Sequence, residues 1–345
     1  MSTGPAERIR ELSGLPIWVA PMAGGPSTAG LVAAAAQAGA LGFLAGGYKT
    51  AAAVRAEMDA VRAAGARAFG VNLFVPGRPA SDTAAVAAYV GSLRAEAARL
   101  GAEVGEPRWD DDGWADKIDL LLGDPPPAVS FTFGCPPPEV IAGFRRRGAL
   151  VGVTVTSPGE AVLAADADCL IVQGREAGAH AGTFANAGPA DTRPGLLDLL
   201  AAVAGTTSLP LIAAGGLADA GGVAAALAAG ATAAAFGTAF LRCAESGAHP
   251  LHKAALADPR RTATAITRAF SGRPARALVN RFVLDHPDAP AAYPEINNAT
   301  RALRAGAAAA GDPDRMSLYA GQGFRAASDR PAAEIIGQLA AGVPR

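Results

Sequence analysis

Short apolar segments recur eight times between residues 15 and 236, and most are followed by a polar loop and a helical stretch. Each is too short for an independent helix and has the composition of a strand that is buried on both faces. Strands that alternate with helices build a parallel sheet, and eight of them close a TIM (β/α)8 barrel. The sequence therefore predicts an α/β barrel with strands at 15–19, 41–45, 69–74, 128–133, 150–155, 169–172, 209–213 and 233–236.

The alternation is interrupted once, and it ends before the chain does. Residues 76–126 hold two predicted helices, 81–100 and 114–122, around an acidic turn at 110–112, and we interpret them as a helical insertion after the third strand. We expect residues 1–245 to form the barrel and residues 246–345 to form a C-terminal extension that packs on the barrel mouth. An open doubly wound sheet has the same alternation, but it normally has fewer strands, and no GxGxxG motif follows the first strand.

Composition and charge exclude several classes of partner. The chain has 345 residues, 50% of them hydrophobic and 18% charged, and its net charge of −1 gives no bulk attraction to nucleic acid or to an anionic membrane. The uncharged run between Glu11 and Lys49 contains three prolines, so we expect no membrane-spanning helix there. The three cysteines are far apart and form no CxxC motif, which is typical of a reduced, cytoplasmic protein without a zinc site.

The sixth apolar segment opens into a polar, glycine-rich loop, QGREAGAHAG, that begins at Gln173. Glycines such as Gly178 allow a tight turn or a close approach of the backbone to a ligand. His180 is the side chain in this loop that titrates near neutral pH, so it is a candidate catalytic residue. The alternative interpretation is a structural histidine with satisfied hydrogen bonds.

In a barrel, the residues that follow the strands converge on one mouth. Glycine-rich loops after the seventh and eighth strands, each followed by a helix, form a phosphate site in many barrels, and we expect a phosphate-bearing cofactor here. The alternative is that these glycines only make tight turns. The residues that converge are Pro21, Met22, Ala23, Asn72, Gln173, His180, Gly215, Gly216, Gly237 and Thr238.

Several motifs in order along the chain carry a resemblance to a known family. They are PIWVAPMAGGPST, GVNLFVP, QGREAGAHAG, AAGG, FGTAFL and SLYAGQG. Together they resemble the nitronate monooxygenases, formerly called 2-nitropropane dioxygenases, over nearly the whole chain. The resemblance implies a TIM barrel that contains FMN and oxidises alkyl nitronates with O2 to a carbonyl compound and nitrite.

The resemblance also implies roles for individual residues. His180 matches the catalytic histidine of the family, and Tyr293, Arg301 and Tyr319 are candidate substrate-pocket residues. Ala179 stands where the family more often has a second glycine before the histidine. The implied FMN contacts are Pro21, Met22, Ala23, Asn72, Gln173, Gly178, Gly215, Gly216, Gly237, Thr238 and Gln322.

Two mechanisms and two other functions remain open at this level. His180 can bind the nitro oxygens by a hydrogen bond or as an imidazolium, or it can remove the α-proton of a neutral nitroalkane as a general base. One alternative function is an NAD(P)H-dependent flavin reductase of the enoyl-ACP reductase type, and another is a flavin-binding protein without turnover. Neither the physiological substrate nor the oligomeric state follows from the sequence.

Overall fold

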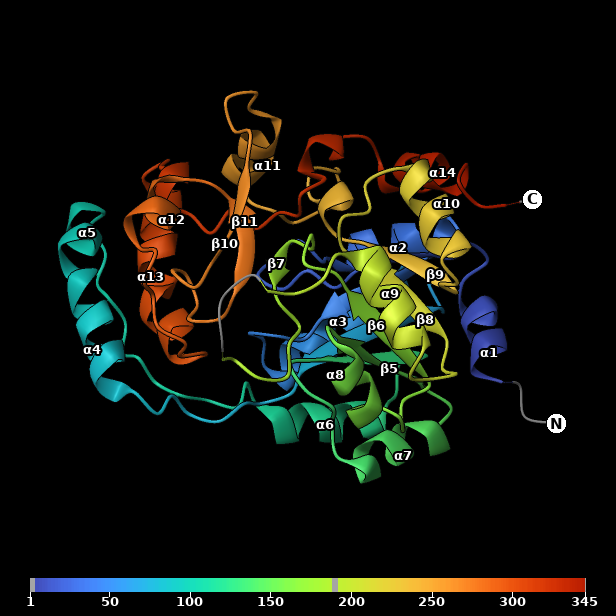
Figure 1. Ribbon diagram of the computed structural model, residues 1–345. Coiled ribbons are helices and arrows are strands. Elements are labelled where there is room, and N and C mark those ends of the chain that lie inside the picture. The colour runs from blue at the N-terminus through green and yellow to red at the C-terminus, as the bar shows by residue number, and fades with distance from the viewer. Residues whose placement is uncertain (1–3, 188–191, 345) are drawn as a thin grey trace.

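The computed structural model describes residues 4–187 and 192–344. Within these residues, eight parallel strands form a closed barrel in the order β1-β2-β3-β4-β5-β6-β8-β9 (Figure 1). The predicted TIM barrel is therefore confirmed. Its strands are β1 Ile17–Val19, β2 Leu41–Ala45, β3 Phe69–Phe74, β4 Ala128–Thr132, β5 Leu150–Val155, β6 Cys169–Gln173, β8 Leu211–Ala214 and β9 Ala233–Phe236.

Helices connect the barrel strands and cover the outside of the sheet (Figure 1). Their N-termini follow ordinary capping rules: the side chain of Thr28 accepts a hydrogen bond from Leu31 N, and that of Thr50 accepts one from Ala53 N. The helices of this layer are α2 Ala29–Gln37, α3 Ala51–Ala63, α6 Trp114–Gly123, α7 Pro138–Arg146, α8 Pro158–Leu163, α9 Leu196–Ala204 and α10 Ala220–Ala228, and α1 Pro5–Leu12 precedes the first strand.

Burial on both faces explains why the strands read as apolar runs. One set of side chains, which includes Trp18, Phe43 and Ile171, fills the barrel interior. The alternate set, which includes Val19 and Val172, packs against the surrounding helices in a second cluster. Because neither face meets water, the sequence shows no polar alternation along these strands.

Local backbone conformation shifts some predicted boundaries. The fourth strand ends at Thr132 instead of residue 133, because Phe133 has φ 77° and cannot continue a strand. The predicted helix at 81–100 is two helices, α4 Thr83–Ser92 and α5 Arg94–Arg99. After β9, the predicted short helix at 239–244 is a single 3-10 turn, η1, at Thr238–Phe240.

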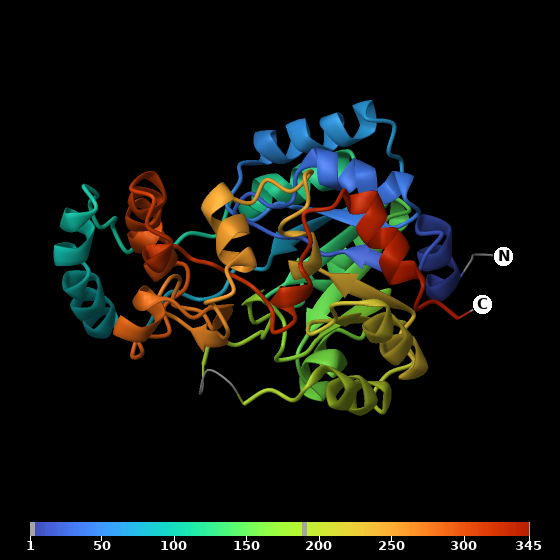
Figure 2. The ribbon, with the colours of Figure 1, turned by 90° about the horizontal axis from the view of Figure 1, so that it is seen from above.

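The two helices α4 and α5 lie beside the C-terminal helices α12 Arg281–Asp285 and α13 Glu295–Ala309, and together they form a lobe next to the barrel (Figures 1 and 2). Leu93, Phe282 and Ile296 share one apolar cluster in this lobe. The remaining C-terminal elements are α11 Pro250–Ala257, β10 Thr264–Thr267, β11 Ala275–Leu278, η2 Pro313–Arg315, η3 Phe324–Ala326 and α14 Ala332–Ala340.

The last helix, α14, returns to the barrel wall. Its residues Ile335, Ile336 and Leu339 belong to the cluster that packs between the strands and the helical layer. Both termini lie on the same side of the molecule, away from the α4–α5 lobe (Figures 1 and 2). The C-terminal part therefore contacts the outside of the barrel as well as its mouth.

A small second sheet joins the loop after β6 to the C-terminal part. Its strand order is β10-β11-β7, where β7 is Ala179–His180. His180 pairs with Ala275 in antiparallel register. This sheet was not predicted, because a two-residue strand has no periodic pattern to detect.

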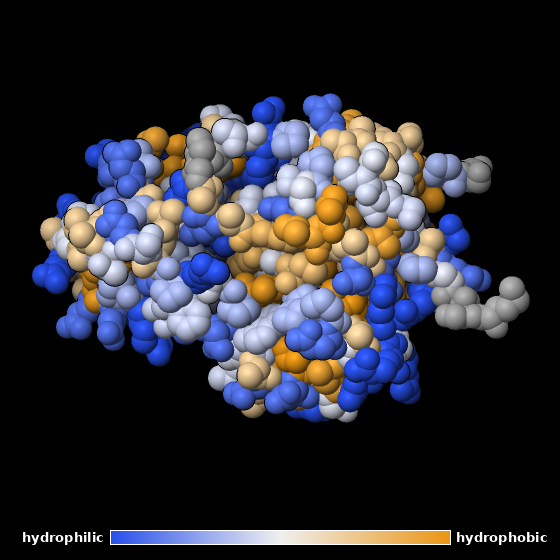
Figure 3. All heavy atoms as spheres, turned by 60° about the horizontal axis from the view of Figure 1, so that its bottom comes forward, coloured by the Kyte–Doolittle hydropathy of each residue, from blue (hydrophilic) through white to orange (hydrophobic). Residues whose placement is uncertain are grey.

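The face shown in Figure 3 mixes polar residues with apolar ones, and the apolar residues gather in an extended patch near its centre. The exposed large apolar side chains include Val162, Leu163 and Leu197 on the outer helices α8 and α9. No helix within residues 4–187 and 192–344 is both long enough and apolar enough to cross a membrane.

A buried carboxylate on α5 connects this helix to the C-terminal part of the chain. Glu96 accepts a hydrogen bond from Arg315 Nε at 2.6 Å, and its other oxygen lies 3.0 Å from His286 Nε2. Glu96 itself is only 6% exposed. Loss of the carboxylate leaves two polar partners without their acceptor, which is costly in a buried position.

We therefore expect Glu96→Ala to lower the free energy of unfolding by about 3 kcal/mol. The control is Glu103→Ala, which removes an exposed carboxylate close in the chain and should change the free energy by less than about 0.5 kcal/mol. Urea denaturation followed by circular dichroism measures both. Equal stabilities of the two variants would contradict the assigned role of Glu96.

Candidate functional site

A cavity of about 420 Å3 lies at the C-terminal ends of the barrel strands, and we call it the inner cavity. Its volume is within the usual range of ligand pockets. Residues of the barrel loops and of the C-terminal part both contribute to its wall. Those lining it include Ala20, Asn72, Gln173, His180, Ala214, Gly237, Thr238, His252, Asn297, Arg304 and Tyr319.

Most of the residues that the sequence analysis selected lie together in this wall. The barrel contributes Pro21, Met22, Ala23, Asn72, Gln173, Gly178, His180, Gly215, Gly216, Gly237 and Thr238, and the C-terminal part contributes Arg301 and Tyr319. Gln322 is different: its side chain is exposed, and its neighbours Gly321 and Gly323 line the cavity instead. The predicted contact of Gln322 with a flavin stays a prediction.

Residues of the C-terminal part of the chain hold the His180 side chain in place. Its Nε2 lies 2.8 Å from the hydroxyl of Ser271, which in turn lies 3.3 Å from the carbonyl oxygen of Arg273. Burial lowers the pKa of His180 to about 3, with a smaller contribution from the positive charges of Arg273 and Arg304. The imidazole is therefore neutral at pH 7.

Three aromatic rings surround the imidazole. The ring centroids of Tyr319, Tyr293 and Phe133 lie 5.3, 5.6 and 5.8 Å from that of His180. The hydroxyl of Tyr293 donates a hydrogen bond to the hydroxyl of Tyr48 at 3.1 Å. These rings shield the imidazole from bulk water, although part of its surface faces the inner cavity, and this shielding explains the desolvation effect on its pKa.

A buried arginine shapes the loop that carries His180. Arg273 is 4% exposed, and its guanidinium donates hydrogen bonds to the carbonyl oxygens of Ala181 and Thr183. The same guanidinium lies 3.9 Å from the ring centroid of Phe133, a cation–π distance. Burial lowers the pKa of Arg273 to about 10, so the side chain remains a cation at pH 7.

Backbone strain is concentrated in the wall of the inner cavity. Tyr48, Phe133 and Ala179 have φ values of 66°, 77° and 59°, in the left-handed region that non-glycine residues rarely adopt. All three line the inner cavity. Strain of this kind costs free energy and persists mainly where function selects the geometry.

Close backbone contacts join the His180 loop to the SLYAGQG segment. A Cβ on Gly178 would lie 2.4 Å from the backbone nitrogen of Gly321, so only glycine fits at position 178. The backbone nitrogen of Gly321 donates to Thr238 Oγ1 at 2.9 Å, and that of Gln322 donates to the carbonyl of Glu176 at 3.0 Å. The segment thus helps to close the cavity through its backbone.

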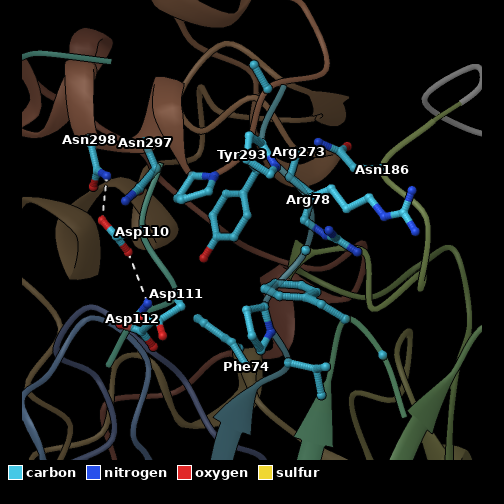
Figure 4. Close-up of a pocket in the computed structure, with 18 of the residues that line it drawn as sticks. Phe74, Arg78, Asp110, Asp111, Asp112, Asn186, Arg273, Tyr293, Asn297 and Asn298 are labelled. Atoms are coloured by element: carbon cyan, nitrogen blue, oxygen red, sulfur yellow. Dashed lines mark hydrogen bonds between the residues drawn. The ribbon is translucent and has the colours of Figure 1, made fainter. Parts of the chain in front are cut away.

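A second, larger cavity of about 840 Å3 adjoins the first, and we call it the outer cavity (Figure 4). Asp110, Asp111 and Asp112 lie on one side of it, and Arg78 and Arg273 lie on the other. Tyr293 lines the outer cavity only, whereas Tyr48, Phe74, Phe133, Asn297 and Arg301 line both cavities. A molecule that reaches His180 from this side must therefore pass the aromatic side chains between the two cavities.

A family model described as "Nitronate monooxygenase" matches residues 7–342. The chain belongs to the nitronate monooxygenase family. A nitronate monooxygenase of Pseudomonas aeruginosa is 39% identical, over 96% of this chain and 98% of that protein.

Solved structures of related proteins have the same overall fold as this nitronate monooxygenase family member. A nitroalkane oxidase from Streptomyces ansochromogenes superimposes with a TM-score of 0.94 at 49% identity and covers 97% of both chains. FabK from Thermotoga maritima superimposes with a TM-score of 0.71 at 27% identity, over 96% of this chain and 94% of that one.

The inner cavity of this family member fits a phosphate-bearing flavin. Gly237 lines the inner cavity, has an ordinary φ of −107°, and could take a Cβ in ordinary contact with Met22 at 3.6 Å, so neither its backbone nor its protein neighbours require glycine. By contrast, Gly215 and Gly216 have φ values of 100° and 73° and pack tightly on the loop at 176–177. Their backbone alone requires glycine, whereas at Gly237 the close approach of a ligand is the better explanation.

Polar atoms without partners support the same fit. Trp18 Nε1, His252 Nε2 and Arg304 Nε are buried, belong to residues that line the inner cavity, and have no hydrogen-bond partner among the described residues. Buried polar groups rarely remain unpaired in proteins. A polar ligand with several donors and acceptors, such as FMN, can pair with them.

Sequence reasoning missed several residues of this nitronate monooxygenase site. Ser271 and Arg273 belong to the stretch FSGRPAR, which carries no motif that predicts a contact with His180. Phe133 was treated only as the end of a strand. Its left-handed backbone places its ring beside His180, a consequence of tertiary structure that no local pattern signals.

The left-handed φ of Ala179 leads to a stability prediction. Glycine adopts this conformation without steric cost, so Ala179→Gly should raise the free energy of unfolding by about 1 kcal/mol. The matched control is Ala181→Gly in the same loop, where φ is not positive and the side chain is buried; it should lower stability by about 0.5–1 kcal/mol. Chemical denaturation measures both, and a loss of stability in Ala179→Gly would contradict the assigned strain.

Proposed function

We propose that this protein is an FMN-dependent nitronate monooxygenase, which oxidises nitronates, and nitroalkanes after loss of their α-proton, with O2 to a carbonyl compound and nitrite. The observation that carries the proposal is a neutral His180 in an aromatic wall of a cavity that fits a flavin. Bound FMN would supply the two-electron chemistry that this chain's side chains do not supply. Family membership and the likeness to a nitroalkane oxidase support the same reaction class.

The flavin would be held along the inner cavity. The backbone at Gly237 and Thr238 is suited to the phosphate, because it opens a helical turn and lines the inner cavity. Thr238 Oγ1 accepts from Gly321 N, which leaves its hydroxyl hydrogen for a second partner. Pro21, Met22 and Ala23 line the same cavity after β1.

The hydrogen bonds around His180 favour the general-base role. The hydroxyl of Ser271 has the carbonyl of Arg273 as its acceptor, so we assign the hydrogen of the His180–Ser271 bond to Nε2 of the imidazole. The lone pair is then on Nδ1, where it can take the α-proton of a nitroalkane. Burial keeps the ring neutral and its lone pair free, but it also lowers the basicity of the ring, so proton uptake depends on the negative charge that develops on the substrate beside it.

The cations near His180 suit an anionic product of that step. Arg273 and Arg304 both lower the pKa of His180 through their charge. Their charge stabilises a nitronate bound at the same place, because charges interact strongly in a desolvated site. Arg304 is further held by Asn297, whose side-chain and backbone oxygens accept from its Nη2 at 2.9 and 3.0 Å.

The first test is the visible spectrum of the purified protein under anaerobic conditions. We expect flavin absorbance that bleaches when a nitronate is added and stays unchanged when NADH is added. Bleaching by NADH alone would instead assign the protein to the flavin reductases. No bleaching by either reductant would indicate a flavin-binding protein without turnover, and a protein that cannot take up FMN would remove the cofactor from the proposal.

The second test concerns His180. We expect His180→Asn to keep its FMN and to lose about 10²- to 10⁴-fold in kcat/KM with a neutral nitroalkane, because the base is gone. With a preformed nitronate the loss should be smaller, since that substrate has no α-proton to remove. Oxygen consumption measures both rates. Equal losses on the two substrates would assign His180 to hydrogen bonding or charge stabilisation, and an unchanged rate would remove it from the mechanism.

A further inference from the structure

His252 is a buried side chain that faces the inner cavity and has no function in the mechanism above. It lies on α11, is 8% exposed, and lines the cavity together with Thr238 and Leu241. Its Nε2 has no hydrogen-bond partner among the described residues, while the backbone of Tyr319 bonds to the imidazole. A buried ring nitrogen that faces a cavity without a partner indicates a missing ligand atom.

His252 lies at the end of the inner cavity that Gly237 and Thr238 line. Leu251, the residue before it, and Met22 both pack against the apolar cluster that contains Leu241. Met22 also lies beside Gly237: a Cβ added to this glycine would be 3.6 Å from the Met22 side chain. The backbone of Tyr319 bonds to His252, and that of Gly321, two residues later, donates to Thr238 Oγ1, so His252 lies near the Gly237–Thr238 backbone that is suited to a phosphate.

This end lacks other cationic side chains. Among the described residues that line the inner cavity, the arginines are Arg301 and Arg304, both on α13. Arg304 affects the pKa of His180 through its charge but is not among the groups that shift the pKa of His252, so its charge acts mainly on the His180 side. A phosphate at the Gly237 end would meet backbone N–H groups and His252.

We propose that His252 binds the phosphate of the flavin and completes the cradle that Gly237 and Thr238 begin. This inference rests on the proposed function, since it takes the inner cavity as the flavin site. Without a ligand, burial lowers the pKa of His252 to about 4 and keeps the ring neutral. A phosphate dianion at Nε2 favours the imidazolium and replaces the missing hydrogen bond with a charge-assisted one.

The test is flavin binding by the full-length protein after its flavin has been removed. FMN and riboflavin, which lacks the phosphate, are titrated separately, and binding is followed by flavin fluorescence. The variants are His252→Leu and, if that protein does not fold, His252→Gln. The matched control is His249→Asn, which removes an exposed histidine three residues away and keeps a residue that caps α11 well.

We expect His252→Leu to raise the Kd for FMN about 10- to 100-fold and to leave the Kd for riboflavin within about twofold of the wild type. The same change removes an unpaired buried nitrogen but also the hydrogen bond to the Tyr319 backbone, so we expect only a small change in the thermal unfolding midpoint of the flavin-free protein. His252→Gln should weaken FMN and spare riboflavin, and His249→Asn should change neither.

Two outcomes would overturn the inference. An FMN Kd unchanged in the His252 variants means that His252 does not bind the phosphate. Equal weakening of FMN and riboflavin means that the residue acts on the ring system or on the shape of the cavity. Failure of the wild-type protein to bind FMN is a different result, because it contradicts the proposed function itself.

Discussion

Strand β1 pairs with β2 along one side and with β9 along the other, so the parallel sheet has no free edge. Closure brings the loop after the first strand beside the loop after the last one, although they are separated by most of the chain. Met22 and Gly237 meet in this way. The inner cavity and its contact with the C-terminal part both depend on this closure, because an open sheet would spread the same loops along an edge.

Desolvation is the second determinant of the site. Aromatic rings shield His180 from bulk water, and this desolvation, with the charge of the buried Arg273, lowers its pKa and keeps the imidazole as an acceptor. Arg273 is itself stabilised by the loop carbonyls and by the ring of Phe133. The same cation therefore orders the loop and attracts an anionic substrate, so one buried charge has both a structural and an electrostatic effect.

The C-terminal part completes the site that the barrel begins. It supplies Ser271, Arg273 and Tyr319 to the surroundings of His180, and the strand pair β7–β11 fixes the His180 loop to it. The left-handed backbone of Ala179 lies within this pairing. A barrel without these segments would have the histidine on a loop open to water, where its pKa would be near the ordinary value and its orientation would not be set.

The sequence by itself determined the eight strands, the barrel and the family, because burial on both faces leaves continuous apolar runs and the motifs are local. It also selected most residues of the barrel mouth, since these directly follow the strands. Only the tertiary structure decided that Ser271 and Arg273 hold His180, that Gln322 is exposed, and that the helix at 81–100 is divided. Contacts between segments far apart in the chain leave no periodic signal in either segment. They follow from how the closed barrel and the C-terminal part pack together, which no local pattern in the sequence contains.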